Sequence, residues 1–544
     1  MATSQSADIR AFLGGGADED RVAAAHFIVG AVFLVLGGLL ELLALFALRF
    51  GGLSPISLGR AEPMANLTLM IGFLVISLVG GVYYVLPRLT GAPLRSPAMA
   101  RAGLGLLVVM VLAGLAAIAF GFGDGSQPFG LPWWLDVPLL AALSLPALNT
   151  LATIARRQET RTYVTLWFVI GGVVWLPLLF AAHVVWTLPF ADSLAQTYSG
   201  LFFSAGFVTM WVFTVGTGLF YYTLVKEVDV PLASRQLAVA GFWSLGFAAV
   251  WWGLAQLIFG PGPGWADAVA AALGLAFPIG ALANASNVSL TLQGHWDRVP
   301  SRPGVASGVI GLFFGVVIAV VASLASFRAI GSVTALTTFW EAVEYACLLG
   351  VGPLLVAGVS FDALPRVTGR AMQSTKRARS FMRLTVIGVG GVLVTMGAAG
   401  IVSGYSWLAG SNSAAYVDAG DGWAAGASAS DPLLLIALAF GVVALLGQLA
   451  YASAVIGTVT SGRAVPQEVL VYDEQGRQGT WQVTVGGNPD ELSKRRSCRR
   501  PRHPRGNRDA LGCGPSHGDR DDGRRGADGV GRRRIDRRPD PGGA

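Results

Sequence analysis

Long apolar segments, separated by short polar connections, repeat along most of the chain. About 20 consecutive apolar residues are enough for one α-helix to cross the hydrocarbon core of a bilayer. Twelve segments meet this criterion, and they are numbered here in chain order. They span residues 22–48, 65–87, 102–122, 132–155, 163–187, 197–225, 237–260, 266–291, 305–327, 337–362, 384–406 and 432–457. We therefore predict an all-α integral membrane protein with twelve transmembrane helices.

The ends of segments 2, 6 and 10 resemble one another in sequence. The three stretches are Tyr83–Arg88, Tyr221–Lys226 and Phe361–Arg366, each about 140 residues from the next. A fixed long period indicates one structural unit that is used several times. Because four predicted helices fit in each period, we predict three pseudo-repeated four-helix units.

The composition agrees with a membrane protein and excludes an ordinary soluble one. The chain is 53% hydrophobic and only 13% charged, and its mean hydropathy is +0.58. That charged fraction is about half the value for soluble domains. The first 20 residues lack the apolar core of a signal peptide, so we expect no cleaved leader.

The distribution of Lys and Arg among the connections predicts the orientation in the membrane. One set of connections carries most of the cations, and the alternate set carries only Arg49, Arg60 and Arg328. Cytoplasmic loops are the cation-rich ones. We therefore expect both termini in the cytoplasm of a prokaryote, with the chain in its plasma membrane. We expect the repeated cations, such as Arg88, to stay hydrated at the membrane surface.

Regions outside the apolar segments divide the chain further. We expect a cytoplasmic N-terminus at 1–21, a membrane domain at 22–460, and a small cytoplasmic β-hairpin within 461–493. Residues 494–544 are rich in Arg, Gly, Asp and Pro, a composition typical of disorder. This tail is either a basic segment for anionic lipid or nucleic acid, or the product of out-of-frame coding sequence. We favour the second interpretation and expect no nucleic-acid partner.

Several motifs along the membrane domain resemble those of a known family. They are Ser57–Arg60 with Pro63, Tyr83–Arg88, Phe220–Tyr222, Phe242 with Trp243, Val250–Gly253, Asn287–Arg298 and Pro365 with Arg366. Their order and spacing resemble subunit I of the haem-copper oxidases, most closely the cbb-type (C-family) cytochrome c oxidase, a relative of nitric oxide reductase. The resemblance covers about residues 20–460. It implies a cytochrome c oxidase subunit I-like fold and a place in respiratory electron transport.

The resemblance also implies a redox centre, whose ligands this chain lacks. In the family, six histidines on segments 2, 6, 7 and 10 hold two haems and a copper ion, because imidazole suits both metals. In this chain segments 2, 6, 7 and 10 contain no histidine. The family's active-site tyrosine corresponds to Ala249. The six ligand positions correspond to Ala65, Ala205, Ala255, Gln256, Val343 and Tyr345. We therefore expect no haem, no copper and no catalytic residue at these positions.

A few polar residues in the apolar segments remain as candidates for function. His183 in segment 5 either forms a hydrogen bond across a helix contact, which we favour, or ligates a haem. Glu341 and Glu344 share one helix face, where they bind a cation or a partner's basic group, or are simply solvated, as we expect. Glu41 either handles protons or pairs with a buried polar group, and we favour pairing. His26 is expected to be solvated at the end of segment 1.

Three functions remain open. We expect a degenerate, non-catalytic paralogue that acts in the bilayer as a scaffold or partner subunit. Cytochrome c-type or cupredoxin-type subunits would bind its outer face, with the acidic loop 407–431 as one docking point. The alternatives are an electron-transfer oxidoreductase with an unconventional haem or quinone site, and a channel for protons or small solutes. Whether the chain is an enzyme is left open, although the resembling family consists of terminal oxidases.

Overall fold

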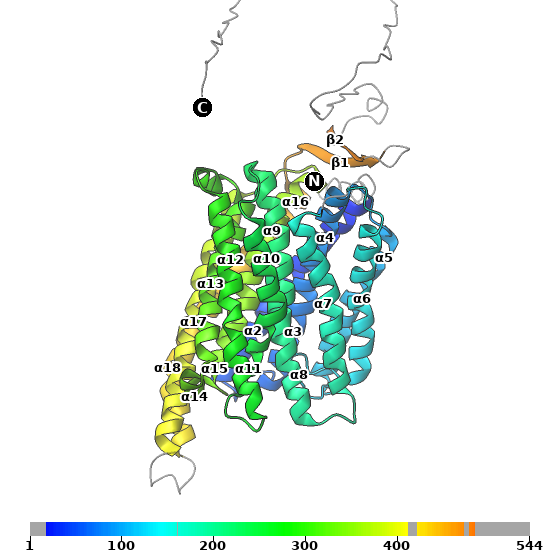
Figure 1. The fold of residues 1–544 in the computed structure, drawn as a ribbon. Helices are drawn as coiled ribbons and strands as arrows, with labels where there is room; N and C mark the ends of the chain where they lie inside the picture. The colour runs from blue at the N-terminus through cyan, green and yellow to red at the C-terminus, as the bar shows by residue number, and fades with distance from the viewer. Residues whose placement is uncertain (1–17, 160–161, 412–420, 473–477, 485–544) are drawn as a thin grey trace, which may run out of the picture. The chain divides into compact units, whose positions relative to one another are not determined.

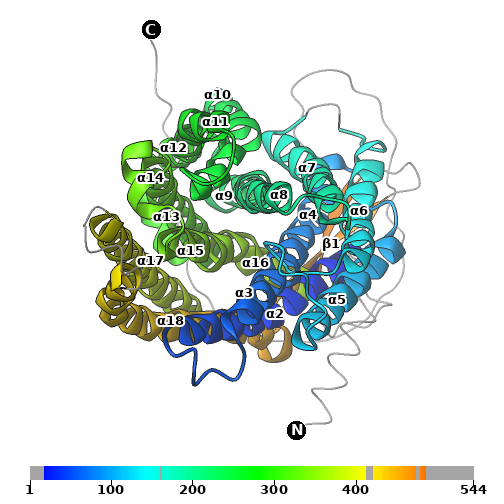
Figure 2. The same ribbon diagram turned by 90° about the horizontal axis from the view of Figure 1, so that it is seen from below.

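The computed structural model describes residues 18–159, 162–411, 421–472 and 478–484. Within this part of the chain, twelve helices are long and apolar enough to cross a membrane. The predicted fold class is therefore confirmed. The helices run side by side (Figure 1), and viewed along the bundle they follow one another around it in chain order (Figure 2).

Many of the twelve segments consist of more than one helical element. Segment 1 is α2 (Asp18–Arg49), and segment 2 is α3 (Leu58–Leu67), η1 (Thr68–Val75) and α4 (Ile76–Thr90). Segments 3, 4 and 5 are α5 (Pro97–Ala119), α6 (Trp133–Ile154) and α7 (Val164–Thr187). Segment 6 is α8 (Ser193–Gly206), η2 (Phe207–Phe213) and α9 (Thr214–Val228). Segment 7 is α10 (Arg235–Trp243), η3 (Ser244–Ala248) and η4 (Ala249–Leu257), and segment 8 is α11 (Gly264–Gly274) and α12 (Ala276–Thr291). Segment 9 is α13 (Pro303–Ala325), with the short helices η5 (Trp296–Ser301) and α14 (Arg328–Thr334) on either side. Segment 10 is α15 (Thr338–Ala346), η6 (Cys347–Val351) and α16 (Gly352–Thr368), and segments 11 and 12 are α17 (Thr375–Ser411) and α18 (Asp421–Ser461).

Segments 2, 6 and 10, which carry the sequence repeat, form the centre of the bundle (Figure 2). Between 89% and 100% of the residues in their most apolar stretches are buried, and in the other segments at most 61% are. The remaining helices surround these three, and α18 closes the ring by packing against α2. The repeat therefore marks the one helix of each four-helix unit that is shielded from lipid.

Glycines allow the three central segments to approach one another closely. In each case a leucine side chain of the next central segment packs against the glycine. A Cβ atom added to the glycine would lie only 2.5 to 2.9 Å from a methyl carbon of that leucine. The contact repeats cyclically, from segment 2 to 6, from 6 to 10, and from 10 back to 2. The pairs are Gly81 with Leu219, Gly216 with Leu355 and Gly352 with Leu74.

The cations of the repeat are not simply hydrated, so that expectation was wrong. Arg88 forms an ion pair with Asp20 of α2, at 3.0 Å, and the side chains of the two residues are only 5% and 2% exposed. Arg88 also donates a hydrogen bond to the Tyr84 carbonyl oxygen at 2.7 Å and lies over the Tyr84 ring. A buried charge needs such a partner, because desolvation is costly.

The other two cations of the repeat lie beside the first, at what we call the cationic end of the bundle. Lys226 donates hydrogen bonds to the hydroxyls of Tyr84 and Tyr222, each at 3.4 Å. Arg366 is paired with Asp362 at 3.0 Å and with Glu227. The network therefore links segments 1, 2, 6 and 10.

The structure also corrects the last connection between segments. Loop 407–431 was expected to be an extended outer loop, but its described residues belong to α17 and α18. The alanines there have the highest helix propensity of any residue, and both helices continue beyond their apolar cores. The expected hairpin region contains β1 (Pro466–Tyr472) and β2 (Gln478–Thr484), which pair antiparallel. Residues 1–17, 412–420 and the tail 494–544 lie outside the described residues.

Candidate functional site

The four segments on which the resemblance places metal ligands share a local feature. Each contains a π-helical stretch: η1 in segment 2, η2 in segment 6, η3 in segment 7 and η6 in segment 10. Both η1 and η2 contact η6, and η2 also contacts η3. Because π-helical turns are rare and often occur at functional sites, this layer is where a site is expected.

The positions predicted to correspond to the family's ligands lie next to this layer. Ala65 and Ala205 come just before η1 and η2, and Val343 and Tyr345 just before η6, whereas Ala255 and Gln256 belong to η4. All except Gln256 are buried. The structure brings part of the set together, because α8 packs against η4 and an added Cβ on Gly253 would lie 2.7 Å from the Ala205 Cβ. Ala249, the position of the family's tyrosine, is also buried in η4.

The side chains at these positions do not fit the family's cofactors. They offer methyl and isopropyl groups, one amide at Gln256 and one phenol at Tyr345, but no imidazole. Bis-histidine haem ligation and a three-histidine copper site both require imidazole nitrogens. Among the described residues, no group of three or more His, Cys, Asp or Glu side chains is arranged to hold a metal ion. No step of a reaction is therefore derived through haem or copper.

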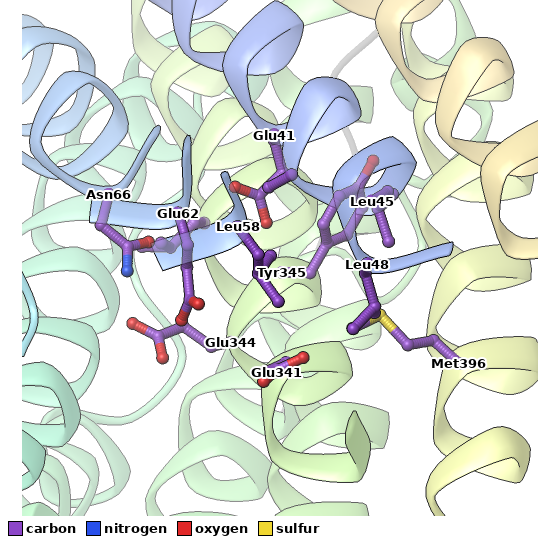
Figure 3. A pocket seen from close by; sticks show the side chains of 12 residues that line it. Glu41, Leu45, Leu48, Leu58, Glu62, Asn66, Glu341, Glu344, Tyr345 and Met396 are labelled. Carbon is purple, nitrogen blue, oxygen red and sulfur yellow. The ribbon is translucent and has the colours of Figure 1, made fainter. Parts of the chain in front are cut away.

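The same region holds a cavity lined by four carboxyl groups (Figure 3). Glu41 comes from α2, Glu62 from α3, and Glu341 and Glu344 from α15. The side chain of Asn66, which is 8% exposed, lies at its edge. Three of the four carboxyl groups, those of Glu62, Glu341 and Glu344, also line a second cavity of about 790 Å³, together with Asn66. Gln256 and Trp340 are on the wall of this larger cavity, and Tyr345 is on the wall of the smaller one.

Within the described part of the chain, the four carboxyl groups have no basic partner. No Lys, Arg or His nitrogen of the described residues lies within 4.0 Å of Glu41, Glu62, Glu341 or Glu344. One buried oxygen of Glu41 and one of Glu344 also lack a hydrogen-bond partner in the described chain. Several ionised carboxylates in one apolar region would repel one another and lose hydration. The arrangement therefore suits a cluster that holds protons, or one that meets a mobile cation.

Sequence reasoning identified three members of this cluster and missed the fourth. Glu41, Glu341 and Glu344 were candidates, and Glu41 forms no hydrogen bond or ion pair with the described residues, so its expected pairing stays a prediction. Glu341 is exposed and Glu344 is half-buried, and both face the cavities. Glu62 was overlooked, although it directly precedes Pro63 in a motif that carries the resemblance.

Neither His183 nor His26 lines the two cavities beside the carboxyl cluster. The Nδ1 atom of His183 is 3.1 Å from the Ser199 hydroxyl oxygen, so the ring is hydrogen bonded across the contact between α7 and α8. His26 was expected to be solvated, but it is buried, with Nδ1 2.7 Å from the Val22 carbonyl oxygen. Its ring packs edge-to-face against Tyr83 of the repeat motif, which shields it from water.

The described residues form twelve membrane helices, three of which are central. Four of the segments share a layer of π-helical turns. This arrangement defines a polytopic membrane protein of the oxidase subunit I type. The family model described as "Cytochrome C and Quinol oxidase polypeptide I" matches residues 21–444, and the chain belongs to this family. Cytochrome c oxidase subunit 1 of Rhodobacter capsulatus is 24% identical, over 81% of this chain and 85% of its own length.

Other relatives and a solved structure agree with this assignment. A cbb3-type cytochrome c oxidase subunit, CcoN1 of Stutzerimonas stutzeri, is 23% identical over 65% of this chain and 76% of its own length. A solved heme-copper terminal oxidase dimer superposes with a TM-score of 0.63 at 15% identity, over 83% of this chain and 86% of that chain. At that identity the structural match shows the fold alone. The family resemblance and the haem-copper oxidase fold are thus confirmed.

Proposed function

We propose that this chain is a non-catalytic member of its family, which keeps the subunit I scaffold and has lost the redox centre. The observation that carries the proposal is the absence of histidine from segments 2, 6, 7 and 10. Four of the six positions matched to the family's ligands hold buried apolar side chains instead, namely Ala65, Ala205, Ala255 and Val343. Function resides in such sites rather than in the fold.

In this proposal the protein acts as a scaffold or partner subunit of a respiratory complex in a prokaryotic plasma membrane. The cationic end faces the cytoplasm, because cation-rich connections stay on that side. Cytochrome c-type or cupredoxin-type subunits would bind the opposite face. The small hairpin β1–β2 follows α18 and would then be cytoplasmic, as would both termini.

The proposal is tested by an absorption spectrum and metal analysis of the purified protein. We expect no Soret band, and haem iron and copper far below one per chain. Stoichiometric haem or copper would overturn the proposal. Purification under mild detergent conditions, followed by mass spectrometry, then identifies the co-purifying subunits. A chain that purifies alone under conditions where related complexes stay intact would argue against the scaffold role.

A second function is favoured by the carboxyl cluster. Glu41, Glu62, Glu341 and Glu344 form a protonatable site within the membrane domain, and acidic side chains there commonly belong to proton or cation pathways. Proton flux into liposomes that contain the protein tests this. We expect Glu344→Gln to abolish any flux above that of empty liposomes, and His26→Gln, outside the cluster, to preserve it. The channel function is excluded if the wild type shows no such flux.

A further inference from the structure

A third cavity lies apart from the carboxyl cluster, at the end of the bundle opposite the cationic end. It has a volume of about 510 Å³ and is lined by residues of α7, α8, η4 and α11. Figure 1 labels α7, α8 and α11. Its walls are mostly aromatic and aliphatic, with Phe202, Trp251 and Trp265 as the large side chains. Sites for small molecules commonly have this size and character, with a few polar groups that orient the ligand.

One of the polar groups on this wall is His183, which is only 3% exposed. Its hydrogen-bond partner fixes the state of the ring. The Ser199 hydroxyl donates its single proton to the Gln196 carbonyl oxygen, at 2.8 Å. With its proton used in this way, the hydroxyl oxygen is left to accept from His183, and we assign the proton of the neutral ring to Nδ1.

The other ring nitrogen of His183 is then a bare acceptor. In a neutral imidazole only one nitrogen carries a proton, and an apolar setting disfavours the charged ring. No hydrogen-bond partner for Nε2 exists among the described residues. The ring is held by stacking on Phe203, with centroids 5.6 Å apart at an interplanar angle of 25°. The acceptor is therefore fixed in position before any ligand arrives.

The other polar groups of the lining are the Asp192 carboxylate, the Tyr198 and Ser199 hydroxyls and the indole N–H groups of its tryptophans. The Asp192 carboxylate accepts a hydrogen bond from the Leu194 amide at 2.8 Å, as the N-cap of α8. Exposed aromatic side chains, Trp186 at 45% and Trp265 at 61%, border the cavity. Such residues prefer the interface between bilayer and water, which favours entry of a ligand from the membrane.

We infer that this cavity binds a neutral, membrane-soluble phenol, whose aromatic ring packs against the tryptophans and whose hydroxyl donates to His183 Nε2. We take the ligand to be neutral because the Asp192 carboxylate is already engaged as the N-cap of α8 and the apolar walls disfavour an ion. It must carry a donor because Nε2 only accepts. The assignment does not depend on the proposed function, since none of these residues belongs to the positions matched to metal ligands.

A matched pair of probes tests the inference on the wild-type protein. The compounds 4-propylphenol and 4-propylanisole share a ring and an alkyl chain, but only the phenol can donate a hydrogen bond. Equilibrium dialysis against detergent-solubilised protein, corrected with protein-free micelles, gives both dissociation constants. We expect the phenol to bind about tenfold more tightly, the usual value of one hydrogen bond. Equal affinities, or no saturable binding of the phenol, would overturn the inference.

Three variants locate the interaction. His183→Leu should bind phenol and anisole alike, and His26→Leu should keep the preference of the wild type, because His26 is buried elsewhere. Ser199→Ala should reduce the preference, because Nδ1 loses the acceptor that fixes the tautomer. A preference for the phenol that survives in His183→Leu contradicts the inference. A Soret band that the wild type shows and this variant loses also contradicts it, because Nε2 would then be a haem ligand. If His183→Leu does not fold, the two probes on the wild type and on Ser199→Ala still decide.

A 4-dodecylphenol probe distinguishes the source of the ligand. If the ligand enters from the membrane, binding of this probe to the protein in nanodiscs should saturate as its concentration in the bilayer rises. 4-Propylphenol should then compete with it. A site that binds the short phenol and excludes the long one would contradict entry from the membrane.

Discussion

Removing Asp20 should destabilise the protein far more than removing Asp18, two residues earlier in the same helix. The Asp20 carboxylate lies 3.0 Å from Arg88, and the two side chains are 2% and 5% exposed. Loss of one partner leaves a buried charge without compensation, which costs about 3–5 kcal/mol. Asp18 is 53% exposed and lies 3.2 Å from Arg21, one helical turn away, and 3.9 Å from the exposed Arg101. An exposed pair of this kind contributes about 0–1 kcal/mol.

The assay is reversible unfolding of the purified protein in mixed micelles, followed by circular dichroism, for Asp20→Ala, Asp18→Ala and the double variant Asp20→Ala/Arg88→Met. The double variant removes both charges, so it should recover much of the stability that Asp20→Ala loses. If Asp20→Ala costs no more than Asp18→Ala, the ion pair is not desolvated and the reasoning fails. If the double variant is no more stable than Asp20→Ala, an uncompensated Arg88 charge is not the cause of the loss.

Three further predictions concern the core, the carboxyl cluster and the third cavity. Gly352→Leu should cost about 1–3 kcal/mol of unfolding free energy by overpacking. Gly105→Leu should be neutral, because a Cβ at Gly105 meets open space. Thermal denaturation compares the two variants, and equal midpoints would refute the close contact at Gly352. Glu344→Gln should not lower the melting temperature, because it removes one of several mutually repelling groups, and a clear decrease would instead indicate a bound cation. The nitrogen NMR spectrum of selectively labelled protein should show His183 protonated at Nδ1 alone, and a proton at Nε2 would contradict the assigned tautomer.

The number of helices and the threefold repeat were accessible from sequence, because both depend on local and periodic properties. Apolar length identifies a membrane helix wherever it occurs, and the stretch that ends in Arg88 is similar to the one that ends in Arg366. The helix ends were less predictable. The helices α17 and α18 extend through most of loop 407–431, where hydropathy falls but helix propensity remains.

The carboxyl cluster was only partly accessible from sequence. The i, i+3 spacing of Glu341 and Glu344 places them on one face of α15, which sequence reasoning recognised. Their encounter with Glu41 and Glu62 depends on the packing of three segments that are distant in the chain. The same limitation explains the error at Arg88, because nothing near it in the sequence indicates that Asp20 of α2 is its partner.

The contacts that hold the three units together explain how such a scaffold can persist without its metal ligands. The glycine–leucine contacts join segments 2, 6 and 10 directly, and the network around Arg88, Lys226 and Arg366 joins them again at the cationic end. None of these contacts uses a position matched to a metal ligand. The replacement of a ligand by a small apolar residue that we propose at Ala65 would therefore leave the interfaces between the units unchanged. Loss of the redox centre and retention of the fold are thus physically compatible, because the two depend on different residues of the same helices.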